Sequence, residues 1–166
     1  MDDQPRTTEP YPDTNTRSIY LGSTRLAHEH LVAQSQVVLR LGRILMKSGA
    51  SAYRIKASMA RLAKAVGLDE HHAQVTFTEI ATTAYGNGNF RTEVAEQRTM
   101  GINSHKIDLL GNFISELPER ITPQEANAEL ERIDSMPHLY KRWMLALASA
   151  VACAGFAFLN RGGLIE

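Results

Sequence analysis

Cysteine is nearly absent from this chain of 166 residues. The single cysteine, Cys153, excludes an intrachain disulfide. Disulfide networks are typical of proteins in oxidising compartments. The cysteine content therefore gives no indication of an oxidising compartment and is typical of a cytosolic redox environment. A chain of this length buries a sizeable core as one domain, without disulfide or metal staples.

The first 22 residues lack the apolar run of a secretory signal. They read MDDQPRTTEPYPDTNTRSIYLG, with three prolines, four acids and no apolar core. This composition is typical of a disordered segment, since it offers little apolar surface to bury. We therefore predict a disordered tail over residues 1–22 and exclude it from the fold.

The chain also lacks net charge, with 18 basic and 18 acidic residues, but the two signs are separated along it. Residues 30–68 contain seven bases and no acid, whereas residues 104–136 contain seven acids and three bases. A basic surface suits anionic lipid or nucleic acid, and the alternative is two solvated helix faces that partly complement each other. Because the basic segment has no interleaved aromatic residue beyond Tyr53, and the chain is not basic overall, we predict no nucleic-acid partner.

Catalytic and metal-binding motifs are not found. His28 and His30 point to nearly opposite sides of a helix, and the other histidines have no partner at ligand spacing. The segment SGASAY is not the G-x-S-x-G nucleophile elbow, and the glycines of YGNGNF belong to a turn and not to a phosphate loop. We therefore predict no metal, no cofactor and no enzymatic activity.

Two amphipathic helical segments follow the tail. Apolar residues recur at helical spacing from Ser23 to Ser48 and again from Ala52 to Val66. Between them, Gly49 suits the left-handed end of one helix and Ser51 suits the N-cap of the next. The pattern predicts a sharp helix–helix corner.

A β-hairpin is predicted over Ala73 to Arg98, a segment rich in Thr, Val, Phe and Tyr. Asn87 and Gly88 suit its type I′ turn, because both residues accept a positive φ at low cost. An isolated hairpin is marginally stable, so it must pack on the helices or pair with other strands. The expected fold is α+β, with a β-hairpin or small antiparallel sheet.

Two shorter helices are expected after the hairpin. The segment GINSHKIDLLGNFISELP predicts a helix that Asn103 or Ser104 caps and that ends near Pro118. In the segment TPQE, Thr122 and Glu125 form a capping box at the start of the next helix. These helices complete a predicted α+β domain over residues 23–137.

Eighteen consecutive residues, Trp143 to Asn160, carry no charge. A helix of this length rises roughly 27 Å, close to the roughly 30 Å hydrocarbon thickness of a bilayer. The run is apolar on all sides, and residues suited to the headgroup level lie at its ends, namely Lys141, Arg142, Trp143 and Arg161. We predict one transmembrane helix, and the alternative is a buried helix of a soluble domain.

Small residues dominate this run. They include Ala146, Ala150, Ala154 and Gly155, whose spacing lets helix backbones approach closely inside a membrane. We therefore expect neighbouring spans, from a second membrane subunit or from self-association. More bases precede the run than follow it, which predicts that the domain at 23–137 is cytoplasmic. Residues 138–166 would hold the transmembrane helix and the start of a membrane domain that we expect to be incomplete.

Four segments in this order resemble the N-terminal part of the threonine/serine exporter family, in particular its split, two-component form. They are LGRILMKSGASAYRI, the GIN before the third helix, ITPQEANAELERI and YKRWMLALASAVACAGFAFLNRGG, with a Thr-rich hairpin between the first and the second. The resemblance runs from about Val32 to Gly163. Each motif is short, so the resemblance rests on their order and spacing.

The resemblance implies a bacterial inner-membrane protein in which a cytoplasmic α+β domain precedes a bundle of membrane helices. It implies export of small polar metabolites by secondary transport, with an ion or proton gradient as the driving force. Threonine and serine are the usual substrates, and dicarboxylates such as succinate are associated with the split form, whose second component is another small membrane protein. Family members continue with further spans after the position of Gly163, so we expect a truncated form or assembly with partner subunits.

Four residues are candidates for substrate binding. Ser51, Tyr53 and Arg54 match the family's helix-corner motif, where free amides at the helix start and the charge of Arg54 suit a carboxylate. Asn103 matches the GIN element. A structural explanation stands beside each of them, as a corner, a surface base or a helix cap.

Three functions remain open at this point. The leading hypothesis is a subunit or fragment of an inner-membrane exporter of small polar metabolites. The first alternative is a membrane-anchored interaction or regulatory module without a pathway of its own. The second is a soluble hydrolase-like enzyme whose activity depends on Ser51.

Overall fold

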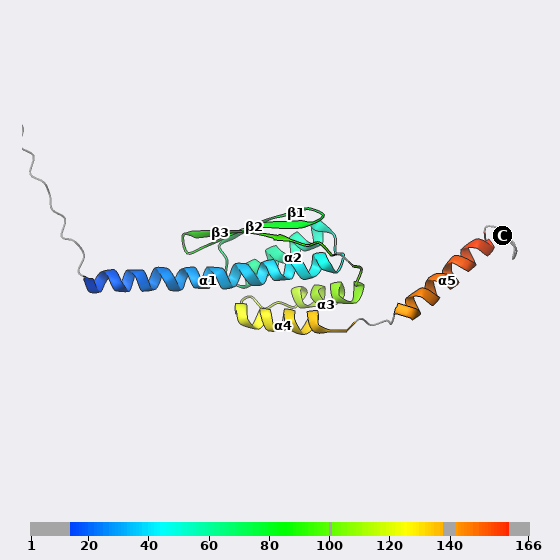
Figure 1. Cartoon of the computed structure of the whole chain (residues 1–166). Helices are drawn as coiled ribbons and strands as arrows, with labels where there is room; N and C mark the ends of the chain where they lie inside the picture. The colour runs from blue at the N-terminus through cyan, green and yellow to red at the C-terminus, as the bar shows by residue number, and fades with distance from the viewer. Residues whose placement is uncertain (1–13, 100, 138–141, 160–166) are drawn as a thin grey trace, which may run out of the picture.

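The computed structural model describes residues 14–99, 101–137 and 142–159, with side chains from residue 25 onwards except those of residues 142 and 145. Its elements are α1 (Thr14–Lys47), α2 (Ala52–Ala65), β1 (Glu70–Val75), β2 (Glu79–Gly86), β3 (Asn89–Glu96), α3 (Ser104–Ser115), α4 (Pro123–Ser135) and α5 (Arg142–Leu159) (Figure 1). Within these ranges, five helices accompany one antiparallel sheet of three strands. The predicted α+β class is confirmed.

Helix α1 is central to the domain that α1–α4 form with the sheet (Figure 1). The inner face of the sheet packs on α1 and α2, and α3 and α4 pack against these two helices from another side. Every layer contributes apolar side chains with almost no exposed surface, among them Leu31, Leu41, Leu45, Ile55, Met59, Leu62, Ile80, Leu110, Leu130 and Ile133. The apolar faces predicted for the first two helices are therefore the faces that build the core.

Helix α1 begins at Thr14, inside the segment that the sequence assigned to a disordered tail. The prolines of that segment end at Pro12, and no residue after them removes a backbone N–H that the helix needs. The first amphipathic helix is therefore longer than predicted. Residues 1–13 lie outside the described residues.

The predicted corner between the first two helices is confirmed. Gly49 has a φ of +85°, the left-handed conformation expected after a helix end. The Ser51 hydroxyl accepts a hydrogen bond from the backbone N–H of Arg54 at 3.4 Å, so Ser51 is the N-cap of α2. The chain thus reverses between Lys47 and Ala52.

The hairpin of β2 and β3 is also confirmed, with Gly86 paired to Asn89 across a turn in which Asn87 and Gly88 have φ values of 53° and 74°. Strand β1 extends the hairpin to a sheet in the order β1-β2-β3, so β2 is central and its two neighbours are edges among the described strands. His71 lies opposite Ala84 in this pairing. The hairpin thus pairs with a third strand, as expected because an isolated hairpin is only marginally stable.

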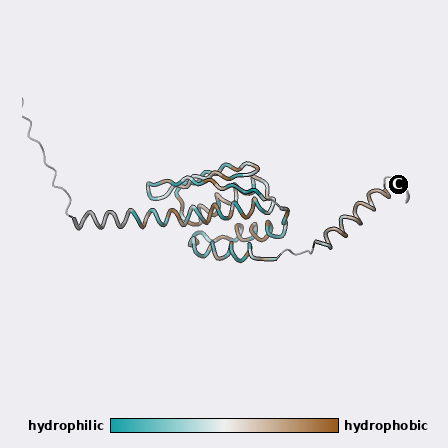
Figure 2. The backbone as a smooth tube through the Cα atoms, in the orientation of Figure 1, coloured by the Kyte–Doolittle hydropathy of each residue, from teal (hydrophilic) through white to brown (hydrophobic). Residues whose placement is uncertain are grey.

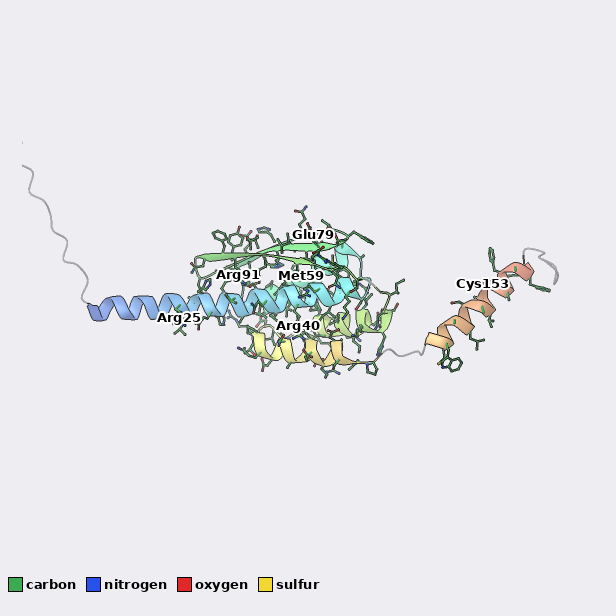
Figure 3. The ribbon with its side chains drawn as sticks, viewed as in Figure 1. Arg25, Arg40, Met59, Glu79, Arg91 and Cys153 are labelled. Carbon is green, nitrogen blue, oxygen red and sulfur yellow. The ribbon has the colours of Figure 1, made fainter. Side chains whose placement is uncertain are left out.

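The edge strand β3 carries a charged pair on the sheet face that looks toward α1. Arg91 and Glu93 lie opposite Ala84 and Thr82, which are buried on that face (Figure 3 labels Arg91). Arg91 Nη2 donates to Glu93 Oε1 at 2.9 Å. Arg91 Nε and Glu93 Oε2 are buried and have no hydrogen-bond partner within the described part of the chain.

Local capping fixes the starts of α3 and α4. Asn103 caps α3, since its side chain accepts a hydrogen bond from the backbone N–H of Lys106 at 3.1 Å. Thr122 and Glu125 form the predicted capping box of α4, in which each side chain accepts a hydrogen bond from the other residue's backbone N–H. The Glu125 carboxylate accepts hydrogen bonds from the backbone N–H and from the hydroxyl of Thr122, and these two bonds lower the pKa of the carboxyl group.

Helix α5 stands apart from the domain (Figure 1), and it contacts no other element of the described chain. Figure 2 shows hydrophobic residues along its length, and each of its described side chains is exposed. Trp143, Val151 and Phe158 keep 63%, 66% and 81% of their surface exposed. In the described ranges, no helix combines the length and apolar character that crossing a bilayer requires. The predicted transmembrane helix is therefore not confirmed.

Candidate functional site

The helix corner presents three of the four predicted substrate-binding residues. Ser51, Tyr53 and Arg54 lie at the start of α2 and are exposed, Tyr53 to 84%. Ser51 borders a hollow of about 440 Å³ between the corner and the turn that joins β1 to β2. Apolar residues such as Ile55 and Phe77 line this hollow, but Tyr53 and Arg54 do not.

The GIN segment lies directly against the helix corner. The backbone N–H of Gly101 donates to the carbonyl of Lys47, and that of Asn103 donates to the carbonyl of Ser48, both at 3.0 Å. The corner and the GIN segment are more than fifty residues apart in the sequence, yet they are joined here by backbone hydrogen bonds. This contact holds the start of α3 against the end of α1.

The predicted binding residues do not converge on one cavity. Asn103 borders a separate hollow of about 250 Å³ with Lys47 and Lys106, whereas Ser51 faces the apolar hollow described above. The Ser51 hydroxyl and the Asn103 side chain each accept a hydrogen bond from a backbone amide at a helix start. Their capping role is confirmed, and substrate binding by Ser51, Tyr53, Arg54 and Asn103 stays a prediction.

Ion pairs that join α4 to other helices were not predicted individually. Lys106 Nζ lies 2.9 Å from Asp134 Oδ1, which joins α3 to the end of α4. Arg40 of α1 reaches α4, where it contacts the Glu131 carboxylate and the Asn127 side chain (Figure 3 labels Arg40). The contact between Arg40 and Glu131 supports the alternative of two partly complementary helix faces. A lysine within an otherwise acidic segment was the sequence signal for the first pair.

Asp134 lies in a strongly positive environment. Its hydrogen bond to Lys106 lowers the pKa of the carboxyl group, and the charges of Lys106, Lys47 and Arg40 lower it further. Asp134 therefore stays ionised well below neutral pH. It lies one residue before the end of α4, so this interaction secures the part of the domain that precedes α5.

The inner face of the sheet holds a second titratable group. His71 Nε2 shares a hydrogen bond of 2.6 Å with the hydroxyl of Thr82, which is 3% exposed. Burial lowers the pKa of His71 from its ordinary value of 6.5, and the charge of the neighbouring His72 lowers it further. The imidazole of His71 is therefore neutral in the folded protein at neutral pH.

We expect acidification to destabilise the domain through His71. The unfolded chain binds a proton at His71 near pH 6.5, whereas the folded protein binds it only at a lower pH. The free energy of unfolding should therefore fall as the pH drops below about 6.5, until the folded-state pKa is reached. Urea unfolding followed by circular dichroism between pH 7.5 and 5 measures this slope.

The matched variant is His71→Gln, which keeps a hydrogen-bonding side chain but does not titrate. Its free energy of unfolding should change less over the same pH range than that of the wild type. An equal slope in both proteins would show that His71 does not carry the effect.

The predicted packing residues of α5, which are Ala146, Ala150, Ala154 and Gly155, are all exposed. An added Cβ at Gly155 would meet no described atom within 4 Å. Of the predicted interface residues, Trp143 is exposed. Lys141 and Arg161 lie outside the described residues, as does the side chain of Arg142.

A metal centre is not visible in the described part of the chain, where no three histidine, cysteine or acidic side chains lie close enough to share an ion. The exposed Cys153 is on α5, remote from the histidines of the sheet.

Comparison with known proteins finds a family model described as "Putative threonine/serine exporter", which matches residues 36–166. The "Probable succinate transporter subunit YjjP" of Escherichia coli (strain K12) is 26% identical over 131 residues, covering 79% of this chain and 51% of that protein. The protein of the same name from Klebsiella aerogenes is 24% identical, with coverage of 79% and 50%. The chain thus spans about half the length of these curated relatives. No solved structure matches significantly.

Proposed function

Since the chain belongs to the threonine/serine exporter family, we propose that it supplies the cytoplasmic domain and first membrane helix of an inner-membrane exporter subunit. The family match begins at residue 36, within α1, and covers all later elements, so it includes most of the domain and all of α5. The domain at residues 23–137 would lie on the cytoplasmic side, where more bases flank the helix.

The exposure of α5 is the observation that carries this proposal. Its 18 residues rise about 27 Å, and large apolar side chains along it, such as Trp143, Val151 and Phe158, are exposed. Contiguous exposed apolar surface of this size marks a site that lipid or another protein covers. The alternative of a helix buried within its own domain has no support in the contacts of α5.

The transported solute is proposed from the relatives. Small polar metabolites are the substrate class that the family description indicates, with threonine and serine as its named members. The names of the bacterial relatives specify succinate and a transporter subunit. We therefore propose secondary export of amino acids of this kind or of small dicarboxylates, driven by an ion or proton gradient, and assembly with a second membrane subunit or a second copy. No cofactor and no catalytic step is needed for that role.

Cys153 offers a direct test of the membrane position of α5. It is the only cysteine, it is exposed in this structure, and it lies near the middle of α5. In membranes from cells that express the chain, we expect a water-soluble maleimide to label Cys153 at least about tenfold more slowly than after denaturation in SDS, because the thiolate does not form in hydrocarbon.

The control places the same probe on the domain. Lys56→Cys in a Cys153→Ala background puts a thiol on an exposed position of α2. This variant should be labelled rapidly in inside-out membrane vesicles and slowly in intact cells. Rapid labelling of Cys153 in membranes, or recovery of the chain in the soluble fraction, would contradict the proposal.

A further inference from the structure

A basic hollow lies on the domain between α1, the segment after β3 and the end of α4. It measures about 290 Å³, and its lining includes Arg40, Arg43 and Lys47 of α1 together with Gln97, Thr99 and Asp134. We propose that this basic hollow binds a small dianion, with two carboxylates or a phosphate group. The proposal depends on the domain alone and does not require α5 to lie in a membrane.

The basic hollow keeps a net positive charge after its ion pairs are formed. Arg40 is neutralised by Glu131, and the Asp134 carboxylate is neutralised by Lys106. Arg43 and Lys47 are exposed, and neither makes an ion pair with a described acidic side chain. Two positive charges are therefore left at the basic hollow, which suits a ligand with two negative charges.

Arg43 and Lys47 both line the basic hollow. Arg43 and Lys47 are four residues apart on α1, a spacing that places side chains one above the other on a helix. Both side chains lie beside α4 and the segment after β3, where each borders the basic hollow. A ligand there would meet both cations without rearrangement of the helix.

Neutral polar groups add hydrogen-bonding capacity to the basic hollow. The Gln97 amide donates to the Thr99 carbonyl at 2.7 Å and to the Thr99 hydroxyl at 3.3 Å. Because that hydroxyl accepts from Gln97, its own proton remains able to point at a bound oxygen. The volume is near the lower end for ligand pockets, about 300 Å³, so it suits a small metabolite and not a nucleotide cofactor.

Asp134 is the group that opposes an anion here. Its carboxylate lines the basic hollow, and it also borders the adjoining hollow of about 250 Å³ that contains Lys106. Because the Asp134 carboxylate repels a bound anion, removing its charge should strengthen anion binding, whereas removing a base should weaken it. Asp134→Asn removes one negative charge, while Lys106 keeps its hydrogen bond to the backbone carbonyl of residue 134. The substitution should therefore tighten anion binding about fivefold, as expected for one exposed charge interaction.

The test uses the full chain in a nonionic detergent. Succinate and inorganic phosphate are titrated separately by calorimetry, with chloride at equal ionic strength and the zwitterion threonine as references. We expect both dianions to bind and both references to give no saturable heat. The double variant Arg43→Gln/Lys47→Gln should lose about tenfold or more in affinity for the dianions.

The matched control is Lys56→Gln/Lys64→Gln, which removes two exposed bases from α2 that do not line the basic hollow. This control should bind like the wild type. Equal losses in the two double variants, or weaker binding by Asp134→Asn, would overturn the proposal. So would an absence of saturable binding of both dianions in the wild type.

A lipid headgroup also carries a phosphate group. Binding to vesicles distinguishes lipid phosphate from free phosphate as the ligand. Vesicles of phosphatidylcholine with and without phosphatidylglycerol are compared by flotation, with and without millimolar phosphate. Competition of free phosphate for the Arg43- and Lys47-dependent binding supports the proposal. Binding to anionic vesicles with no response to either soluble dianion would overturn it.

Discussion

Gly49→Ala is expected to destabilise the domain by about 2–5 kcal/mol, the sum of a backbone cost of about 1–2 kcal/mol and a steric cost of about 1–3 kcal/mol. The backbone cost arises because Gly49 has a φ of +85°, which residues with a Cβ rarely adopt. The steric cost arises because a Cβ would lie 2.7 Å from the carbonyl oxygen of Gly101. The contact between the corner and the GIN segment would have to separate.

Gly88→Ala is the matched control for this substitution. Gly88 also has a positive φ, +74°, but an added Cβ would meet no described atom within 4 Å. Gly88→Ala should therefore lower the free energy of unfolding by the backbone cost alone, about 1–2 kcal/mol. Amide hydrogen exchange of α2 and β2 measures the domain separately from α5. Equal losses in protection for the two variants would show that the approach to Gly101 carries no energy.

The second large effect is expected from Ala150→Trp, because a wide side chain would separate helices that pack through small residues. Ala150 lies in the row of Ala146 and Ala154, each one turn of α5 apart. The association constant, obtained from the fraction of chain in an assembly larger than a monomer, should fall at least about tenfold, which corresponds to about 1.4 kcal/mol. Native gels of membranes solubilised in mild detergent measure this fraction.

Ala152→Trp tests whether the position or only the size of the new side chain matters. Residue 152 is 200° around the helix from residue 150, so it lies on the opposite side of α5. This variant should retain most of the assembly. Loss of assembly in both variants would remove the case for a specific small-residue face, and retention in both would favour a helix that serves only as an anchor.

The elements that the sequence predicted well are those that neighbouring residues determine. The left-handed Gly49, the Ser51 cap, the turn at Asn87 and Gly88 and the capping box begun by Thr122 each depend on contacts within about four residues. The side chains and backbone groups involved are neighbours in the sequence, so they come into contact independently of how the rest of the chain folds. Their physical signals are therefore fully contained in short segments.

The features that were missed depend on segments far apart in the chain. Strand β1 exists as a strand because it pairs with β2, and Lys106 reaches an acid that is 28 residues away. The GIN segment was expected to be a turn and cap, which Asn103 confirms, but its hydrogen bonds to the helix corner could not be read from spacing. A single sequence carries no direct signal for such tertiary pairs.

The candidate site shows the same division. Ser51 and Asn103 were recognised from motifs, and their local capping bonds are those that were predicted. Arg43 and Lys47 were recognised only as part of a basic helix face. That they border a hollow with Asp134 follows from the packing of α4 against α1, which the helical periodicity of either segment does not specify.

The charged pair on β3 bears on how copies of the chain behave when crowded. Natural edge strands resist uncontrolled pairing when charged side chains point inward, because a strand added there would have to desolvate them. Arg91 and Glu93 occupy such inward positions on an edge of the described sheet, and each keeps a buried polar atom unbonded. These charges therefore oppose aggregation by pairing of β3 with a strand of another molecule. Association between molecules would then occur through the helices.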